Sequence, residues 1–171
     1  MNKNWHGIMK IIEVQHVRNN SIIWEQKNVY NTLHALGEEF FLKCCFQISE
    51  NHPPENYYLG LDNRTSVSVS DDIDSLIDEP TGVNGYLRKP VNSMTGFDIT
   101  PVSGIYRATS QIVSFVATGG GWGPVSNIFI TNSNLNDGNT VLLATASLSS
   151  AITLNNGDNV NMRMSLSLQD C

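Results

Sequence analysis

Three runs of apolar residues in the C-terminal part of the chain, Gly123–Leu168, constrain the fold most strongly. In the last run, Val160–Leu168, every second residue is apolar. Because successive side chains of a β-strand point to opposite faces, this run buries one face and exposes the other. The other two runs cover residues 124–131 and 141–148, and turn-forming Asn, Asp and Gly residues separate the three. We therefore predict three antiparallel strands joined by short turns.

Length and charge limit the classes of partner. The chain has 171 residues, which suits one domain, and a formal charge of −6 at pH 7. Its ten Lys and Arg residues are scattered along the chain, whereas phosphate contacts need clustered basic side chains. No apolar run approaches the roughly 18–20 residues of a membrane span, and polar residues interrupt 8–17, where a signal peptide would be apolar. We expect no nucleic-acid or membrane partner and synthesis in the cytoplasm.

The cysteines and histidines predict neither a metal site nor a cofactor. Cys44 and Cys45 are adjacent in a helical pattern, where disulfides are rare, and we interpret both as buried thiols. No Cys or His spacing matches a zinc site. For Cys171, the last residue, an intermolecular disulfide in an oxidising medium remains an alternative.

The N-terminal region predicts a hairpin arm. Residues 8–17 and 21–24 are rich in β-branched residues, and Asn19-Asn20 between them suits a tight turn. Since a lone hairpin is marginally stable in water, it must lie on the main body or on a neighbouring subunit. We predict a tail and arm at 1–28, followed by a β-sandwich domain at 29–171. The residues predicted to contact a partner are Ile11, Ile12, Val14, Ile22, Ile23 and Trp24.

One long helix is predicted at Asn31–Phe46, with Asn31 or Asn28 as its cap. Apolar residues recur there at spacings of three and four, which gives one broad stripe for the core or, alternatively, for a partner. Gly37 inside this helix predicts close packing or a bend, because glycine costs about 1 kcal/mol relative to alanine in a helix interior.

Five acidic residues lie within Asp71–Glu79. A glycosidase needs two carboxylates that flank one sugar bond, and a calcium loop needs a regular ligand spacing that this segment lacks. We interpret the cluster as a solvated short helix capped by Ser70, with catalysis and an incidental calcium site as alternatives. No nucleophile elbow, phosphate-binding loop or dinucleotide fingerprint is present, so we do not expect an enzyme.

Residues 105–116 predict another strand, and the segment before it, through Gly104, is expected to be irregular. Trp122 follows in a glycine-rich connector. Its indole could stack on a sugar ring, or it could close the edge of the sandwich as a bulky plug, which we favour.

The order of several short motifs resembles that of small structural proteins of tailed bacteriophage virions. The resemblance covers residues 22–168 and departs from the usual pattern at Leu87 and at Ile128–Ile130. The motifs are Tyr57–Leu61, Asp78-Glu79-Pro80, Gly85–Arg88, Trp122–Ile128, Leu142–Ala144 and Asn156–Val160.

This resemblance implies a non-enzymatic virion protein present in many copies. The fold that we predict is mainly β: a single antiparallel, jelly-roll-like β-sandwich with one amphipathic helix. The predicted role is capsid decoration or cement, with other virion proteins, above all the major capsid protein, as partners and self-association as a homotrimer by analogy. The alternatives are a tail, neck or fibre-associated protein, a carbohydrate-binding module that contacts the host surface, and a hydrolase built around Asp71–Glu79.

Overall fold

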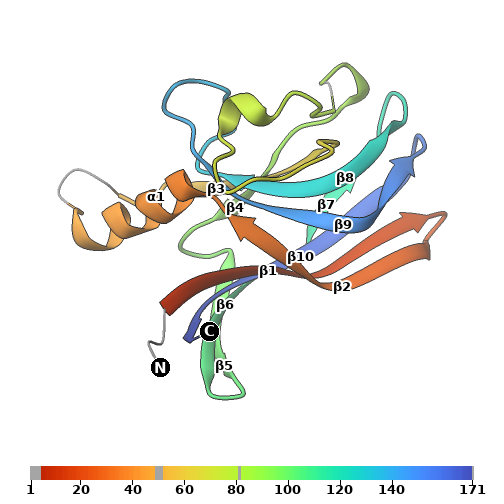
Figure 1. The fold of residues 1–171 in the computed structure, drawn as a ribbon. Helices are drawn as coiled ribbons and strands as arrows, with labels where there is room; N and C mark the ends of the chain where they lie inside the picture. Colours follow the sequence, from red (N-terminus) through yellow and green to blue (C-terminus); the bar gives the residue numbers. More distant parts are fainter. Residues whose placement is uncertain (1–4, 49–51, 81, 171) are drawn as a thin grey trace.

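The computed structural model describes residues 5–48, 52–80 and 82–170 (Figure 1). Within them the chain forms ten β-strands, one α-helix and two short 3₁₀ helices. The elements are β1 (Trp5–Arg18), β2 (Ser21–Leu33), α1 (Ala35–Phe46), β3 (Asn56–Asp62), η1 (Ile73–Ser75), η2 (Gly82–Asn84), β4 (Lys89–Asn92), β5 (Phe97–Val102), β6 (Ile105–Ser110), β7 (Val113–Val116), β8 (Trp122–Thr131), β9 (Leu142–Leu154) and β10 (Asn159–Asp170).

One antiparallel sheet carries the whole fold, which confirms the predicted mainly β class. Its strands follow the order β4-β3-β8-β9-β2-β1-β10-β6-β5, and β7 also pairs with β10. Because β7 contacts β4, the sheet curls into a nearly closed barrel, and the predicted sandwich or jelly roll is not confirmed. The three predicted C-terminal strands are present as β8, β9 and β10.

The predicted N-terminal hairpin forms, with Asn19 and Asn20 at φ 50° and 60° in its turn. These positive φ values suit the tight turns that join two adjacent strands, and Asn tolerates them. The hairpin is not a separate arm, however. β1 pairs with β10 over most of its length and β2 pairs with β9, so the hairpin separates two strands that are consecutive in sequence. Residues 1–4 of the predicted tail lie outside the described residues.

Helix α1 begins four residues later than predicted, at Ala35. The reason is that β2 continues to Leu33 through pairing with β9, so Asn31 belongs to a strand and caps no helix. His34 takes the N-cap position without a side-chain cap bond, and its backbone N–H donates to the oxygen of Leu143 at 3.0 Å. The close packing predicted at Gly37 is confirmed, because a Cβ atom there would lie 2.2 Å from the same oxygen.

The apolar stripe of α1 is only partly buried. Cys44 is buried, and Phe40 and Phe41 are half-buried against the core. Leu42, in contrast, is 60% exposed, and Cys45 is exposed too. Helix α1 lies at one side of the barrel (Figure 1). It packs Phe40 and Phe41 against the core and leaves other apolar side chains exposed.

Candidate protein-binding site

An apolar pocket of about 160 Å³ opens between α1 and the β5–β6 hairpin. Helix α1 contributes Phe41, and strands β3, β5, β6, β8 and β10 supply most of the remaining wall. Two lining side chains, those of Tyr57 and Ser93, carry a hydroxyl group, and no lining side chain is charged. The lining residues are Phe41, Tyr57, Ser93, Phe97, Ile99, Ala108, Ile130, Met164 and Leu166.

Three aromatic rings form a connected row along the pocket. The ring of Tyr57 lies 6.4 Å from that of Phe41 and meets that of Phe97 edge-on at 6.3 Å. Burial raises the pKa of Tyr57 to about 12, which reflects the apolar surroundings of its hydroxyl. The row links the helix to the projecting hairpin, so the pocket depends on both elements.

Beside the pocket, a void of about 10 Å³ lies deeper in the barrel and shares Ile130 and Met164 in its lining. Asn31 also lines this void, and its buried Nδ2 atom has no hydrogen-bond partner within the described residues. A space of this size is close to that of one water molecule. The void beside the pocket is therefore lined by apolar side chains and by the unpaired Nδ2 of Asn31.

The outer edge of β5 adds backbone groups to this site. β5 ends the strand order, so no strand of the described chain pairs with its outer edge. Figure 1 shows the β5–β6 hairpin, in green, pointing away from the barrel. Five of the six residues of β5 are exposed, and Ile99 is 70% exposed although its side chain lines the pocket.

Sequence reasoning missed this strand, since the segment before Gly104 was expected to be irregular. Two local signals were available. Phe97 and Ile99 alternate with the polar residues Asp98 and Thr100, and Ser103-Gly104 supplies a two-residue hairpin turn with φ values of 53° and 82°.

The six predicted interface residues fall into different environments. Ile11 and Val14 are buried in the barrel core, at 4% and 0% exposure, because β1 is an inner strand and not an arm. They offer no surface to a partner. Trp24 packs against the core from a half-buried position, and Ile12 is also half-buried. Of the six, only Ile22 and Ile23, near the start of β2, are exposed, at about half of their surface.

Trp122 is 3% exposed, which favours the predicted plug and leaves no free face for a sugar ring. Its indole N–H donates to the backbone oxygen of Asn84 at 2.8 Å. The ring packs edge-on against Tyr86 at 5.3 Å, and Tyr86 stacks on Phe115 at 6.0 Å. The indole of Trp122 is therefore held inside the molecule by this hydrogen bond and by the ring of Tyr86.

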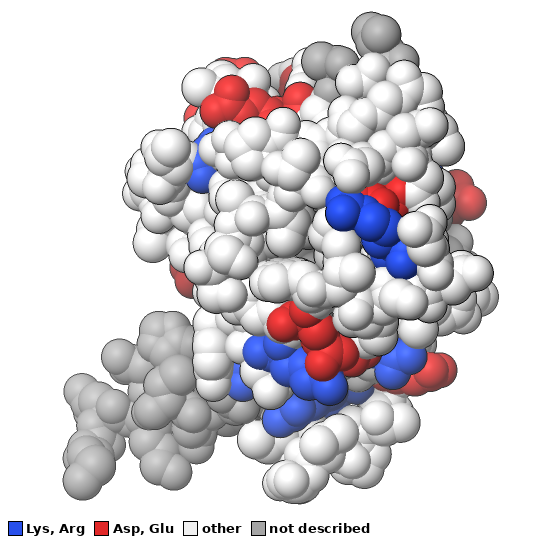
Figure 2. Space-filling model, turned by 90° about the vertical axis from the view of Figure 1, so that its right-hand side faces the viewer, with Lys and Arg blue, Asp and Glu red and all other residues white. Residues whose placement is uncertain are grey.

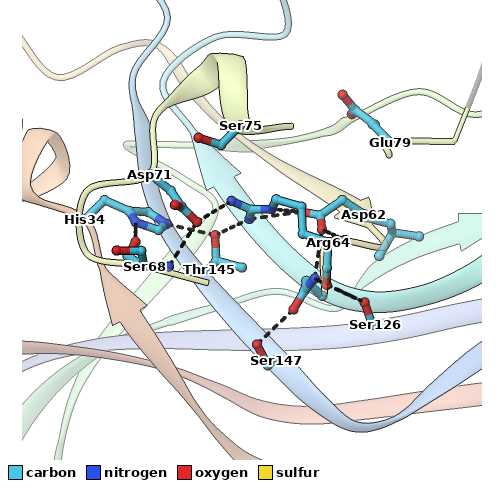
Figure 3. Close-up of polar contacts among 12 residues, drawn as sticks. His34, Asp62, Arg64, Ser68, Asp71, Ser75, Glu79, Ser126, Thr145 and Ser147 are labelled. Atoms are coloured by element: carbon cyan, nitrogen blue, oxygen red, sulfur yellow. Dashed lines mark hydrogen bonds and ion pairs between the residues drawn. The ribbon is translucent and has the colours of Figure 1, made fainter. Parts of the chain in front are cut away.

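A buried polar network joins the loop after β3 to β8 and β9 (Figure 3). Arg64 stands at its centre and pairs with Asp62 at 3.0 Å and with Asp71 at 2.9 Å. Its Nη2 also donates to the hydroxyl of Thr145 at 2.8 Å. Asn127 extends the network by donating to Asp62. Because Arg64 and Asp62 are buried, the network fixes the loop and exposes little surface to a reactant.

His34 belongs to the same network and is fully buried. Its Nδ1 lies 2.8 Å from the backbone oxygen of Ser68, which can only accept, so Nδ1 carries the proton. Its Nε2 lies 2.8 Å from the Thr145 hydroxyl, which accepts from Arg64 and still has its own O–H to donate to an unprotonated Nε2. Burial lowers the pKa of His34, and the Arg64 charge acts in the same direction. These contacts fit a neutral ring.

The acidic segment is less solvated than predicted. Asp71 pairs with Arg64, and Glu79 pairs with Arg88 at 2.8 Å. Asp72, and not Ser70, caps the three-residue helix η1 by accepting from the Asp74 backbone N–H. The two arginines lie seven and nine residues from their partners, and local patterns did not indicate either pair.

A second anchor holds the turn between β9 and β10. Asp158 accepts two N–H bonds from Arg18, at 2.9 and 2.7 Å, and one from His16 at 2.8 Å. Arg18, with the Asn155 backbone N–H and His16, holds the pKa of Asp158 well below its usual range. This anchor ties β1 to the end of the barrel, which is a structural role.

Other site classes gain no support from the described part of the chain. Its His, Cys, Asp and Glu side chains form no group of three or more that could hold a metal ion. No helix among the described residues is long and apolar enough to cross a membrane. On the face in Figure 2, positive and negative side chains are mixed. Among the described residues, Lys27 pairs with both Glu13 and Glu25.

Comparison of the sequence with models of known protein families and with curated proteins finds no match. The features of the described structure that indicate a function are the apolar pocket and the open edge of β5.

Proposed function

We propose that this chain is a structural protein of a tailed-phage virion that binds neighbouring protein subunits. The observation that carries the proposal is the apolar pocket whose lining includes Phe97 and Ile99 of β5, the strand whose outer edge is unpaired among the described residues. An open edge in a monomer invites pairing with another chain, and apolar surface beside it adds hydrophobic stabilisation to such a contact. Chemistry on a substrate would instead need polar groups that converge on the pocket, and its lining holds none that is charged.

The virion part of the proposal rests on the order of short sequence motifs, which resembles that of small phage structural proteins. Within that class, a capsid decoration protein seated on the major capsid protein is our specific proposal, with a homotrimer as its form on the capsid. The exposed Ile22 and Ile23 at the tip of the β1–β2 hairpin offer a second contact in such an assembly.

Binding of the purified chain to virion parts tests this function. The labelled protein is mixed separately with assembled heads and with isolated tails of the parent phage and then sedimented, while mass spectrometry of whole particles gives its copy number. Saturable binding to heads in many copies supports decoration. Binding to tails alone would retain a virion role and refute decoration, and absence from both parts would refute the virion proposal.

A further inference from the structure

We infer that the outer edge of β5 receives an extended segment of a partner protein, which adds a strand to the sheet and inserts one apolar side chain into the pocket. The inference deepens the proposed function, on which it rests for the identity of the partner as a protein. Its physical basis is that the free backbone groups and the pocket lining belong to the same residues.

The backbone orientation of β5 follows from its pairing with β6. The Gln111 N–H donates to the oxygen of Gly96 at 3.1 Å, which places Gly96 at a position bonded toward the β6 side. Backbone groups alternate between the two edges of a strand, and Asp98 and Thr100 therefore also face β6. The N–H and C=O groups of Phe97 and Ile99 consequently face outward, along the unpaired edge.

Pro101 occupies the next outward position and has no N–H to donate. It costs the hairpin nothing there, because that position faces away from β6. It also ends the run of outward N–H groups toward the hairpin tip. The edge therefore suits a short added strand centred on Phe97 and Ile99 and gives little support to long sheet extension.

The side chains of Phe97 and Ile99 lie on the pocket face of β5. A strand added at the usual spacing of about 4.8 Å would place alternate side chains on this same face. A cavity of about 150 Å³ is large enough to hold benzene, so the pocket of about 160 Å³ has room for one leucine or phenylalanine side chain. The uncharged lining favours an aliphatic or aromatic residue at that position of the partner.

A small apolar molecule would occupy the pocket without pairing with the strand edge. A second copy of this chain would occupy both, and the bound fraction would then rise with the concentration of the protein itself. An added partner strand makes a narrower claim, since it requires the outward N–H of Ile99. That atom can be removed selectively. Ile99→Pro deletes it without removing a bond to β6, and Ile99→Ala is the matched variant that shortens the side chain but keeps the N–H.

The probe is a short fluorescent peptide that alternates leucine with threonine, and the control is a peptide of the same composition with its leucines contiguous. Fluorescence anisotropy is measured with the full chain and with both variants, after thermal unfolding has shown that each variant folds. We expect the alternating peptide to bind at least about tenfold more tightly than the control, and Ile99→Pro to bind it at least about tenfold more weakly than Ile99→Ala. Equal binding of the two peptides, equal binding by the two variants, or no binding would overturn the inference.

Amide hydrogen exchange gives a second readout on the full chain. We expect the amides of Phe97 and Ile99 to exchange at least about tenfold more slowly with the alternating peptide bound. Protection that grows with protein concentration in the absence of any peptide would identify a second copy as the occupant and overturn the partner-strand claim. If the chain binds the alternating peptide but neither heads nor tails, the inference stands and the virion proposal is refuted. If it binds heads or tails but not the peptide, the virion proposal stands and the inference is refuted.

Discussion

Replacing Gly37 by alanine tests how α1 is seated on the barrel. An added Cβ would lie 2.2 Å from the backbone oxygen of Leu143, whereas ordinary contact begins at 3.4 Å. The helix would therefore have to retreat by 3.4 − 2.2 = 1.2 Å, since a backbone oxygen of a central strand cannot rotate away. The same oxygen accepts the N–H of His34, and this hydrogen bond would lengthen as the helix moves.

Two opposing effects decide the magnitude. Alanine improves helix propensity by up to about 1 kcal/mol. Overpacking costs about 1–3 kcal/mol, and weakening the bond from His34 adds about 0.5–1.5 kcal/mol. We therefore expect Gly37→Ala to lower the free energy of unfolding by about 2 kcal/mol. The displacement would also move Phe41 and so open the pocket, which would weaken binding of the alternating peptide.

Urea unfolding measures the change, with the midpoint expected to fall at an unchanged slope. Gly138→Ala is the matched control, because a Cβ there meets nothing within 4 Å. If Gly37→Ala were as stable as the native chain, the close seating of α1 against Leu143 would be refuted. A loss of stability in the control equal to that at Gly37 would remove the steric explanation as well.

Three further predictions concern the polar anchors. Because burial lowers the pKa of His34, the unfolded chain binds a proton first, and stability should fall as the pH drops below about 6.5; urea midpoints at successive pH values should show this fall, and His34→Gln should remove it. The pKa of Asp158 is lowered chiefly by Arg18, so its contribution is present above about pH 4 and lost below, and acid titration of Asp158→Asn should lack that second fall. Tyr86→Phe should cost about 1–3 kcal/mol in urea unfolding by leaving a buried N–H unpaired, whereas Tyr106→Phe, at an exposed site, should cost nothing measurable.

Local patterns in the sequence predicted the elements better than their arrangement. The alternation from Val160 to Leu168 and the turn at Asn19-Asn20 each depend on neighbours in the chain, and the predicted strand and turn are both present. The predicted burial of one face holds only as far as Met164, because Ser165 and Ser167 on the opposite face are buried as well. The start of α1 was predicted wrongly because pairing of Asn31 with β9, a long-range contact, outweighs its capping tendency. The same limit explains the hairpin arm, since nothing local indicates that β1 and β2 insert between β9 and β10.

The pocket is harder to predict because its lining comes from six elements. No two of Phe41, Tyr57 and Ile130 lie within one local pattern, and they meet only through the curvature of the sheet. The buried arginines show the same limit, because the partners of Arg64 include Thr145 on a distant strand. A sequence periodicity reports which face of an element is apolar, and it does not report where two such faces fail to close.

The position of the open edge follows from how β10 divides its pairing. β1 occupies one side of β10 almost throughout, while the other side pairs with β7 at residues 159–162 and with β6 at residues 165–167. The first pairing brings β7 to β4 and nearly closes the barrel. The second carries β6 and β5 past the barrel end, so β5 has no strand to close against, and Met164 and Leu166 continue the core face into the pocket. The chain thus places a strand with one unpaired edge where its apolar interior reaches the surface. A short open edge is tolerated in water, and covering both the edge and the apolar surface would stabilise the fold.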